Sequence, residues 1–105
     1  MNQREISGIN IEFDEENYMT DSDLWNEEIA KVIAEEEGIY ELTDRHFMVI
    51  SFMRKEFDEK GSAPSIRKLT KESGVPIKEL YQLFPSGPAK KAARIAGLKK
   101  PQGCI

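Results

Sequence analysis

Apolar and polar residues alternate near the start of the chain. Between residues 3 and 19 the alternating apolar positions are Ile6, Ile9, Ile11 and Phe13. Ser7-Gly8 and the segment 14–17 supply residues that favour turns. This pattern predicts a short β-hairpin, which Tyr18 and Met19 could extend. Because an isolated hairpin is only marginally stable in water, we expect it to pack on helices.

A helical pattern follows the hairpin. Its apolar positions have the spacing of one helix face: Trp25, Ile29, Val32 and Ile33. Residues 20–23 offer side chains that can cap a first turn, and Gly38 is typical of a helix stop. The pattern therefore predicts a helix that runs from this cap to about Glu37.

The next helical segment is longer and more apolar. Thr43 can cap a helix over residues 44–60, and Gly61 would end it. Its apolar residues are Phe47, Val49, Ile50, Phe52, Met53 and Phe57. A helix that is apolar around so much of its circumference is predicted to be the central and most buried one. His46 lies one turn into this helix. We interpret it as a partly buried structural residue, and an acid–base role is the alternative.

Short helical segments separated by glycine and proline make up the second half. Pro64 introduces a helix over residues 65–73, which Gly74 ends, and Pro76 introduces another over residues 77–84. Residues 85–88, Pro-Ser-Gly-Pro, force a turn before an alanine-rich helix over residues 89–96 that Gly97 closes. The following LKKPQGCI reads as an arm that is ordered only if it docks.

These elements predict a mostly α-helical fold. It is a small helical bundle with a helix-turn-helix-like unit, an N-terminal β-hairpin and a mobile C-terminal arm. Residues 1–97 would form a single domain, and residues 98–105 a flexible arm that carries the thiol. No apolar run approaches the roughly 18–20 residues that span a bilayer, and the N-terminus lacks the pattern of a signal peptide. A cytoplasmic protein without membrane contact is therefore expected.

Charge is divided unevenly along the chain, whose net charge is -4. Residues 1–59 carry five basic and seventeen acidic side chains, a net charge of -12. Residues 60–105 carry ten basic and two acidic side chains, a net charge of +8. This asymmetry has two interpretations: the C-terminal half meets an anionic partner, or the two halves attract each other within one fold. The pattern leaves both open.

Residues 65–84, SIRKLTKESGVPIKELYQLF, have the layout of a DNA-reading helix-turn-helix. In that interpretation Lys78, Tyr81 and Gln82 would face the major groove. The second helix contains no arginine, however, and arginine is the commonest specific reader of guanine. Two helices joined by a glycine-containing turn are also a common packing unit without any DNA role. DNA binding is therefore kept as an alternative.

The only cysteine, Cys104, lies one residue before the end of the chain. A single cysteine excludes an internal disulfide, and one cysteine with one histidine disfavours a metal site, so no metal or cofactor is expected. Gly103 would let the backbone bend into a partner's cleft. Positive charge from Lys99, Lys100 and Arg94 would lower the pKa of the thiol and favour the reactive thiolate. The alternative is a terminal cysteine without a function.

The segment LFPSGPAKKAARIAGLKKPQGCI closely resembles the C-terminus of the DsrC/TusE family. That family includes the gamma subunit of dissimilatory sulfite reductase and the TusE sulfur-relay protein. The shared pattern F-P-x-G-P-x-K-x-A-x-x-I-A-G-L-x-K-P-x-G-C runs here from Phe84 to Cys104. The N-terminal hairpin, the Asp23-Leu24-Trp25 stretch and the APSIRKL segment before the turn also resemble this family.

The resemblance implies a sulfur carrier. In the family the penultimate cysteine accepts sulfur as a persulfide, and that residue corresponds to Cys104. It implies sulfur-donor and sulfur-acceptor proteins as partners, and at most a sulfurtransferase-type carrier that has no independent turnover. Lys90, Lys99 and Lys100 would steer docking and support the thiolate.

The chain departs from the DsrC branch at Ala93, where that branch has a second cysteine. The layout with one thiol is more similar to TusE, and closure of an internal disulfide could not occur. Lys99 stands where the family often has proline. The resemblance also admits a gamma-type subunit or regulator of a dissimilatory sulfite reductase, and the residue pattern leaves a helix-turn-helix DNA-binding regulator as a further alternative.

Overall fold

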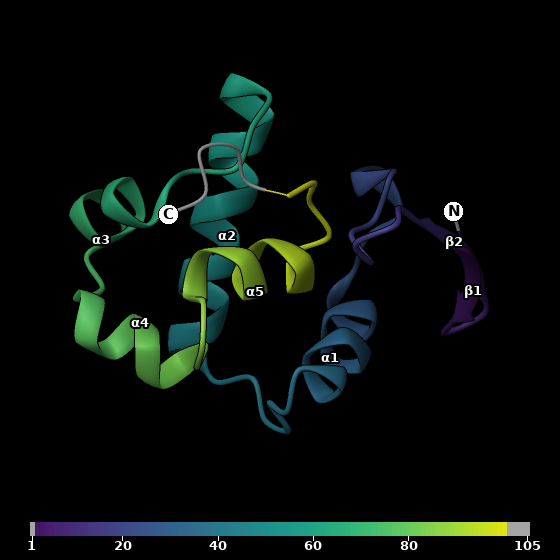
Figure 1. The fold of residues 1–105 in the computed structure, drawn as a ribbon, viewed down its shortest axis with the longest axis horizontal. Coiled ribbons are helices and arrows are strands. Elements are labelled where there is room, and N and C mark those ends of the chain that lie inside the picture. Colours follow the sequence, from purple (N-terminus) through teal and green to yellow (C-terminus); the bar gives the residue numbers. More distant parts are fainter. Residues whose placement is uncertain (1, 101–105) are drawn as a thin grey trace.

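The computed structural model describes residues 2–100, so the predictions for Gly103 and Cys104 lie outside the described residues. Within this range the elements are β1 (Asn2–Ile6), β2 (Ile9–Phe13), α1 (Glu27–Glu36), α2 (Asp44–Lys60), α3 (Ile66–Ser73), α4 (Ile77–Leu83) and α5 (Pro88–Ile95). Helices α2 and α5 occupy the centre, with α1 and the hairpin on one side and α3 and α4 on the other (Figure 1). The predicted mostly helical fold with an N-terminal hairpin is confirmed.

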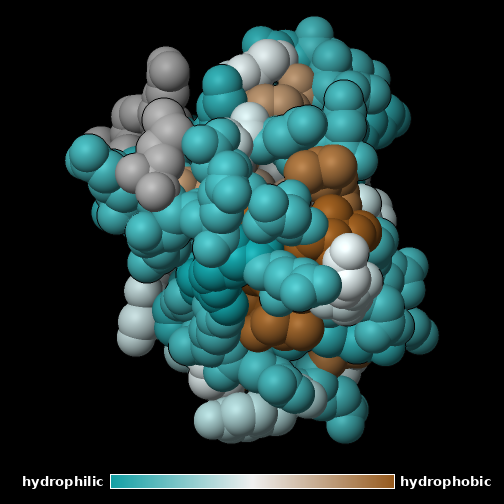
Figure 2. All heavy atoms as spheres, turned by 90° about the vertical axis from the view of Figure 1, so that its right-hand side faces the viewer, coloured by the Kyte–Doolittle hydropathy of each residue, from teal (hydrophilic) through white to brown (hydrophobic). Residues whose placement is uncertain are grey.

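The hairpin forms as the alternating pattern predicted. Strands β1 and β2 are antiparallel, and Ile6 pairs with Ile9 across a two-residue turn. Ser7 and Gly8 both have positive φ, 53° and 81°, as a type I′ turn requires. Met19 forms a bridge with Phe13, which confirms the predicted extension. Seen from the hairpin side, most of the surface is hydrophilic and apolar atoms gather in one band (Figure 2).

The first helix begins later than the sequence predicted. The Asp21 side chain accepts a hydrogen bond from the Asp23 N–H and caps a separate 3₁₀ turn (Ser22–Leu24). Trp25 is extended, and Asn26 caps α1 by accepting a hydrogen bond from the Ile29 N–H. The predicted cap at residues 20–23 was wrong because two capping side chains in succession start two separate elements.

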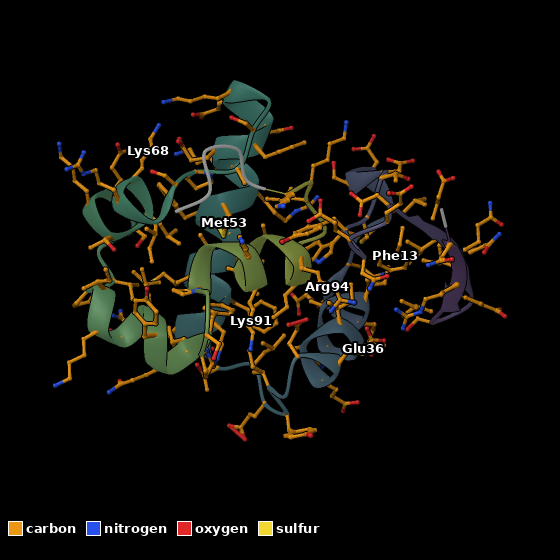
Figure 3. All side chains as sticks on the ribbon, viewed as in Figure 1. Phe13, Glu36, Met53, Lys68, Lys91 and Arg94 are labelled. Atoms are coloured by element: carbon orange, nitrogen blue, oxygen red, sulfur yellow. The ribbon has the colours of Figure 1, made fainter. Side chains whose placement is uncertain are left out.

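Helix α2 has the predicted bounds and lies at the centre, but it is not the most buried helix. Five of its seventeen residues are buried, whereas six of the eight residues of α5 are buried. Helix α5 contacts α1, α2, α3 and α4, and its small alanine side chains allow close approach of its neighbours. Met53 of α2 is fully buried and lies where the two helices cross (Figure 3).

His46 has the structural role that we predicted. The Thr43 N–H donates a hydrogen bond to Nδ1 of His46 at 3.0 Å, which completes a capping box at the start of α2. Because Nδ1 is an acceptor there, Nε2 carries the proton and donates to the Leu83 carbonyl at 2.9 Å. His46 therefore joins the start of α2 to the end of α4.

The helix-turn-helix-like unit is also confirmed. Ser65 caps α3, and Gly74 ends it with a φ of 83°. Val75 in the turn is fully buried, as are Leu69 of α3 and Leu80 of α4. No helix within residues 2–100 is long and apolar enough to cross a membrane.

Candidate functional site

Helix α5 ends in a Schellman motif, which turns the chain into the segment that carries the predicted sulfur acceptor. The Leu98 N–H donates to the Ala93 carbonyl at 3.0 Å, and the Gly97 N–H donates to the Arg94 carbonyl at 3.2 Å. Gly97 has a φ of 75°, as this motif requires. Leu98, the first residue of the predicted arm, is only 1% exposed. Residue 98 is therefore anchored in the core.

Two side chains from distant parts of the chain hold the same helix end. Nε1 of Trp25 donates to the Ile95 carbonyl at 2.7 Å, and Nη1 of Arg54 donates to the Ala96 carbonyl at 2.7 Å. Arg54 also lies over the Trp25 ring, with its Cζ 4.3 Å from the ring centroid. Burial of the Arg54 guanidinium lowers its pKa from the ordinary value, partly offset by Asp58 and Asp23. Arg54 stays charged, because an arginine is protonated throughout the physiological range.

Gly97 lies against the Trp25 ring. A Cβ added at Gly97 would lie 2.5 Å from Cδ1 and 2.8 Å from Cβ and Cγ of Trp25. Those distances are well inside van der Waals contact, so this position requires glycine for its space as well as for its positive φ.

Arg94 is engaged within the fold. Its Nε donates to the Asn17 carbonyl at 2.7 Å, Nη1 to Glu37 at 2.7 Å and Nη2 to Glu36 at 2.9 Å. Figure 3 shows Arg94 on α5 and Glu36 on α1 facing each other. Hydrogen bonds from Arg4 and Arg94 lower the pKa of the Glu36 carboxyl. The guanidinium of Arg94 thus joins α5 to α1 and to the loop after the hairpin, while the thiol that it was predicted to support lies outside the described residues.

The predicted docking lysines lie around the same helix. Lys90 lines a cleft of about 410 Å³ between α5, the end of α1 and the loop at residues 16–18, and Arg94 lines it as well. Nζ of Lys100 lies 2.7 Å from a carboxylate oxygen of Glu16, which also lines this cleft. Lys99 is exposed. The structure therefore brings Lys90, Arg94 and Lys100 to one side of α5.

The alternative DNA contacts Lys78, Tyr81 and Gln82 are all exposed on α4. Glu79, which follows Lys78, forms a bidentate ion pair with Arg45 of α2, with both N···O distances at 2.7 Å. Ile77 and Tyr81, one helical turn apart, are each about half exposed. The exposed part of α4 thus combines one lysine with apolar side chains.

Sequence reasoning missed Arg54 and gave Trp25 no role at the end of α5. The hydrogen bond of Arg54 spans 42 residues and that of Trp25 spans 70 residues. Hydrophobic periodicity reports only on neighbours within one element, so it could not reveal these contacts.

The fold and the anchored end of α5 define a small helical protein with a fixed base for a C-terminal cysteine. Residues 5–105 match the family described as "DsrC like protein", and the chain belongs to this family. It is 44% identical over 108 aligned positions to "Sulfurtransferase TusE" of Pectobacterium atrosepticum, covering 96% of this chain and 98% of the relative. It is 40% identical over 98 residues to "Sulfite reductase, dissimilatory-type subunit gamma" of Nitratidesulfovibrio vulgaris, covering 93% of each chain.

Solved structures agree with this assignment. The NMR structure of Allochromatium vinosum DsrC superposes with a TM-score of 0.85 at 39% identity, covering 99% of this chain and 98% of that chain. A chain in the crystal structure of dissimilatory sulfite reductase I (DsrI) superposes with a TM-score of 0.88 at 38% identity, covering 99% and 100%. The resemblance to the DsrC/TusE family inferred from the sequence is confirmed.

Proposed function

We propose that this protein is a sulfur carrier, which accepts sulfane sulfur on Cys104 as a persulfide and passes it to a partner protein. The observation that carries the proposal is its 44% identity, over nearly the full length of both chains, to a relative named a sulfurtransferase. Cys104 is the only cysteine of the chain, so it is the only thiol that can take part. The protein is then a carrier for its partners' chemistry and has no turnover of its own.

The transfer needs only one kind of step. The Cys104 thiolate attacks the outer sulfur of a donor persulfide, the donor's S–S bond breaks, and the donor leaves as a thiolate. Cys104 is now a persulfide. An acceptor thiolate then attacks the outer sulfur of this persulfide and releases the Cys104 thiolate. The sulfane sulfur keeps its oxidation state, so no oxidant or reductant is consumed.

Lys90, Lys99 and Lys100 have a docking role in this proposal. They lie on α5 or directly after it, and Lys90 and Lys99 are exposed. An acidic surface on a donor or acceptor would be attracted to this end of the molecule, and such steering raises association rates most at low ionic strength. We further propose that the carrier works in the cytoplasm, where thiols are kept reduced.

Ala93 determines how sulfur leaves. With a second cysteine at this position, its thiolate could attack Cys104 and close a disulfide, expelling the carried sulfur. Ala93 has no such group, so the persulfide on Cys104 persists until an acceptor thiol arrives. This favours handover between proteins.

Persulfide loading tests the proposal. The purified protein is incubated with a small-molecule persulfide such as glutathione persulfide, and its intact mass is measured. We expect a gain equal to one sulfur atom, which dithiothreitol removes, and no gain for Cys104→Ser. No added sulfur on the wild type, or equal addition to both proteins, would refute the proposal.

The second candidate function is a subunit of a dissimilatory sulfite reductase, favoured by the 40% identity to a protein of that name. A tagged copy expressed in the native cell distinguishes the two. Stoichiometric co-purification with a sulfite reductase supports the subunit, whereas recovery of the chain without it supports free carriage. Sequence-specific DNA binding through α4 stays a prediction, and steep salt dependence together with loss in Lys78→Ala would support it.

A further inference from the structure

We propose that Trp25 and Arg54 are positioning residues, which fix the point from which the segment carrying Cys104 starts. Together with Gly97 they form what we call the α5 latch. This inference rests on the proposed function, because the position of the thiol matters only if partners must reach it. The latch itself is a property of described residues and can be tested separately.

The latch holds carbonyl groups that a helix cannot satisfy by itself. The last carbonyls of an α-helix have no partner within the helix. In α5, Ile95 and Ala96 provide such carbonyls, and each accepts a hydrogen bond of 2.7 Å from Trp25 or Arg54. The positive charge of Arg54 also opposes the partial negative charge of the helix C-terminus.

The two donors come from different elements, so they restrain the helix end in more than one direction. Trp25 lies in the segment before α1, and Arg54 lies on α2. Nη2 of Arg54 bonds in addition to the Ser22 carbonyl at 3.2 Å. The flat guanidinium therefore bridges two carbonyls while it stacks on an indole, which the single ammonium group of lysine cannot do.

Gly97 completes the latch because Trp25 lies where a Cβ would be. The chain leaves α5 directly beneath the indole and inserts Leu98 into the core. A cleft of about 430 Å³ lies beside this point, and Arg54 and Leu98 both line it. A latch at this place sets both the origin and the initial direction of the following residues.

Fixing the origin limits how far the thiol can reach. Cys104 lies six residues after Leu98, so its Cα can be no more than about 20 Å from the Cα of Leu98. If the last turn of α5 opened back to Ala92, twelve residues would be free and the limit would double to about 40 Å. For a flexible chain, doubling its length lowers the effective concentration of the thiol at a docked partner about threefold.

The single cysteine allows a direct test in the full-length protein. A nitroxide is attached to Cys104, and the broadening of backbone amide signals is measured by NMR for residues 2–100. We expect broadening confined to one region around the end of α5. In Arg54→Gln it should weaken there and extend to amides that are unaffected in the wild type.

Arg45→Gln is the matched control. Arg45 lies on the same helix and pairs with a carboxylate of another helix, Glu79, but it has no hydrogen bond to α5. The broadening pattern of Arg45→Gln should equal that of the wild type. Trp25→Phe should spread the broadening as Arg54→Gln does, and Arg54→Lys should give an intermediate pattern. If Arg54→Gln does not fold, Trp25→Phe and Arg54→Lys test the proposal instead.

Thermal unfolding of each variant separates positioning from general stability. A purely structural role would lower Tm without changing the pattern at a temperature where the protein is folded. Unchanged patterns in folded Arg54→Gln and Trp25→Phe would overturn the latch. Small-molecule persulfide loading is measured in parallel. If the pattern spreads but wild-type Cys104 takes up no sulfur, the proposed function fails and the latch stands as a structural restraint.

Discussion

Replacement of Gly97 by alanine probes the closest approach at the end of α5. Gly97 has a φ of 75°, and its missing Cβ would lie 2.5 Å from Trp25. Two costs therefore add at one position: an alanine in the left-handed region and a collision with a side chain that is held by its hydrogen bond to Ile95. Gly61 provides a comparison, because its φ is 76° and nothing lies within 4 Å of its Cβ position.

The two costs have different sizes. Placing a residue other than glycine in the left-handed region costs about 1–2 kcal/mol. Overpacking against fixed neighbours costs about a further 1–3 kcal/mol. We therefore expect Gly61→Ala to lower the free energy of unfolding by about 1–2 kcal/mol, and Gly97→Ala by about 2–5 kcal/mol. The larger loss is a substantial part of the roughly 5–15 kcal/mol that stabilises a typical domain.

Urea unfolding followed by far-UV circular dichroism measures both losses. The difference between the variants isolates the contact with Trp25, because the φ angles of the two glycines agree within 1°. In a Trp25→Gly background all three contacting atoms are gone, and Gly97→Ala should cost no more than Gly61→Ala. Equal losses for the two alanine variants in the wild-type background would refute this account of Gly97.

Three further predictions concern other residues. Because Arg4 and Arg94 lower the pKa of Glu36, its contribution to stability is present above the unfolded pKa of about 4.3 and is lost as pH falls through the lower folded pKa. Urea midpoints of the wild type should therefore fall more steeply below about pH 5 than those of Glu36→Gln, and parallel profiles would contradict this. His46→Ala removes an acceptor from the start of α2 and a donor from the Leu83 carbonyl, so it should cost about 1–3 kcal/mol in the same assay, and a loss below about 0.5 kcal/mol would count against it. Ala93→Cys should shed its sulfur after persulfide loading: the thiolate at position 93 attacks the Cys104 sulfur, hydrosulfide leaves and an internal disulfide forms, whereas retention of the sulfur as in the wild type would show that the buried position is out of reach.

Much of the fold followed from local rules. The hairpin turn, the Thr43 cap and the glycine stops at Gly38, Gly61 and Gly74 depend on residues close together in the sequence, and the structure has them all. The predicted start of α1 was wrong because local rules do not decide which of two successive capping side chains begins the helix. The greater burial of α5 was missed because alanine is only weakly apolar, and its burial reflects the four helices that surround it.

Only those parts of the candidate site that depend on residues close together in the sequence could be predicted. The terminal cysteine and the lysines around α5 could be read from the sequence. The partners of Arg94 and Arg54 could not, since they depend on elements brought together by folding. Arg94 shows the difference most clearly: its predicted role near the thiol stays a prediction, and its hydrogen bonds to Asn17, Glu36 and Glu37 could not be read from the sequence.

The contacts of Arg94 also bear on the stage of synthesis at which the chain can complete its fold. They join α5 to residues 57, 58 and 77 positions earlier, and α5 itself contacts all four other helices. A nascent chain that ends before α5 therefore lacks the centre of its core, and its acidic first half lacks five of the ten basic side chains of residues 60–105. Folding is completed only when α5 has left the ribosome. Chaperones would meet the protein before that point, whereas partners would meet the carrier only after it.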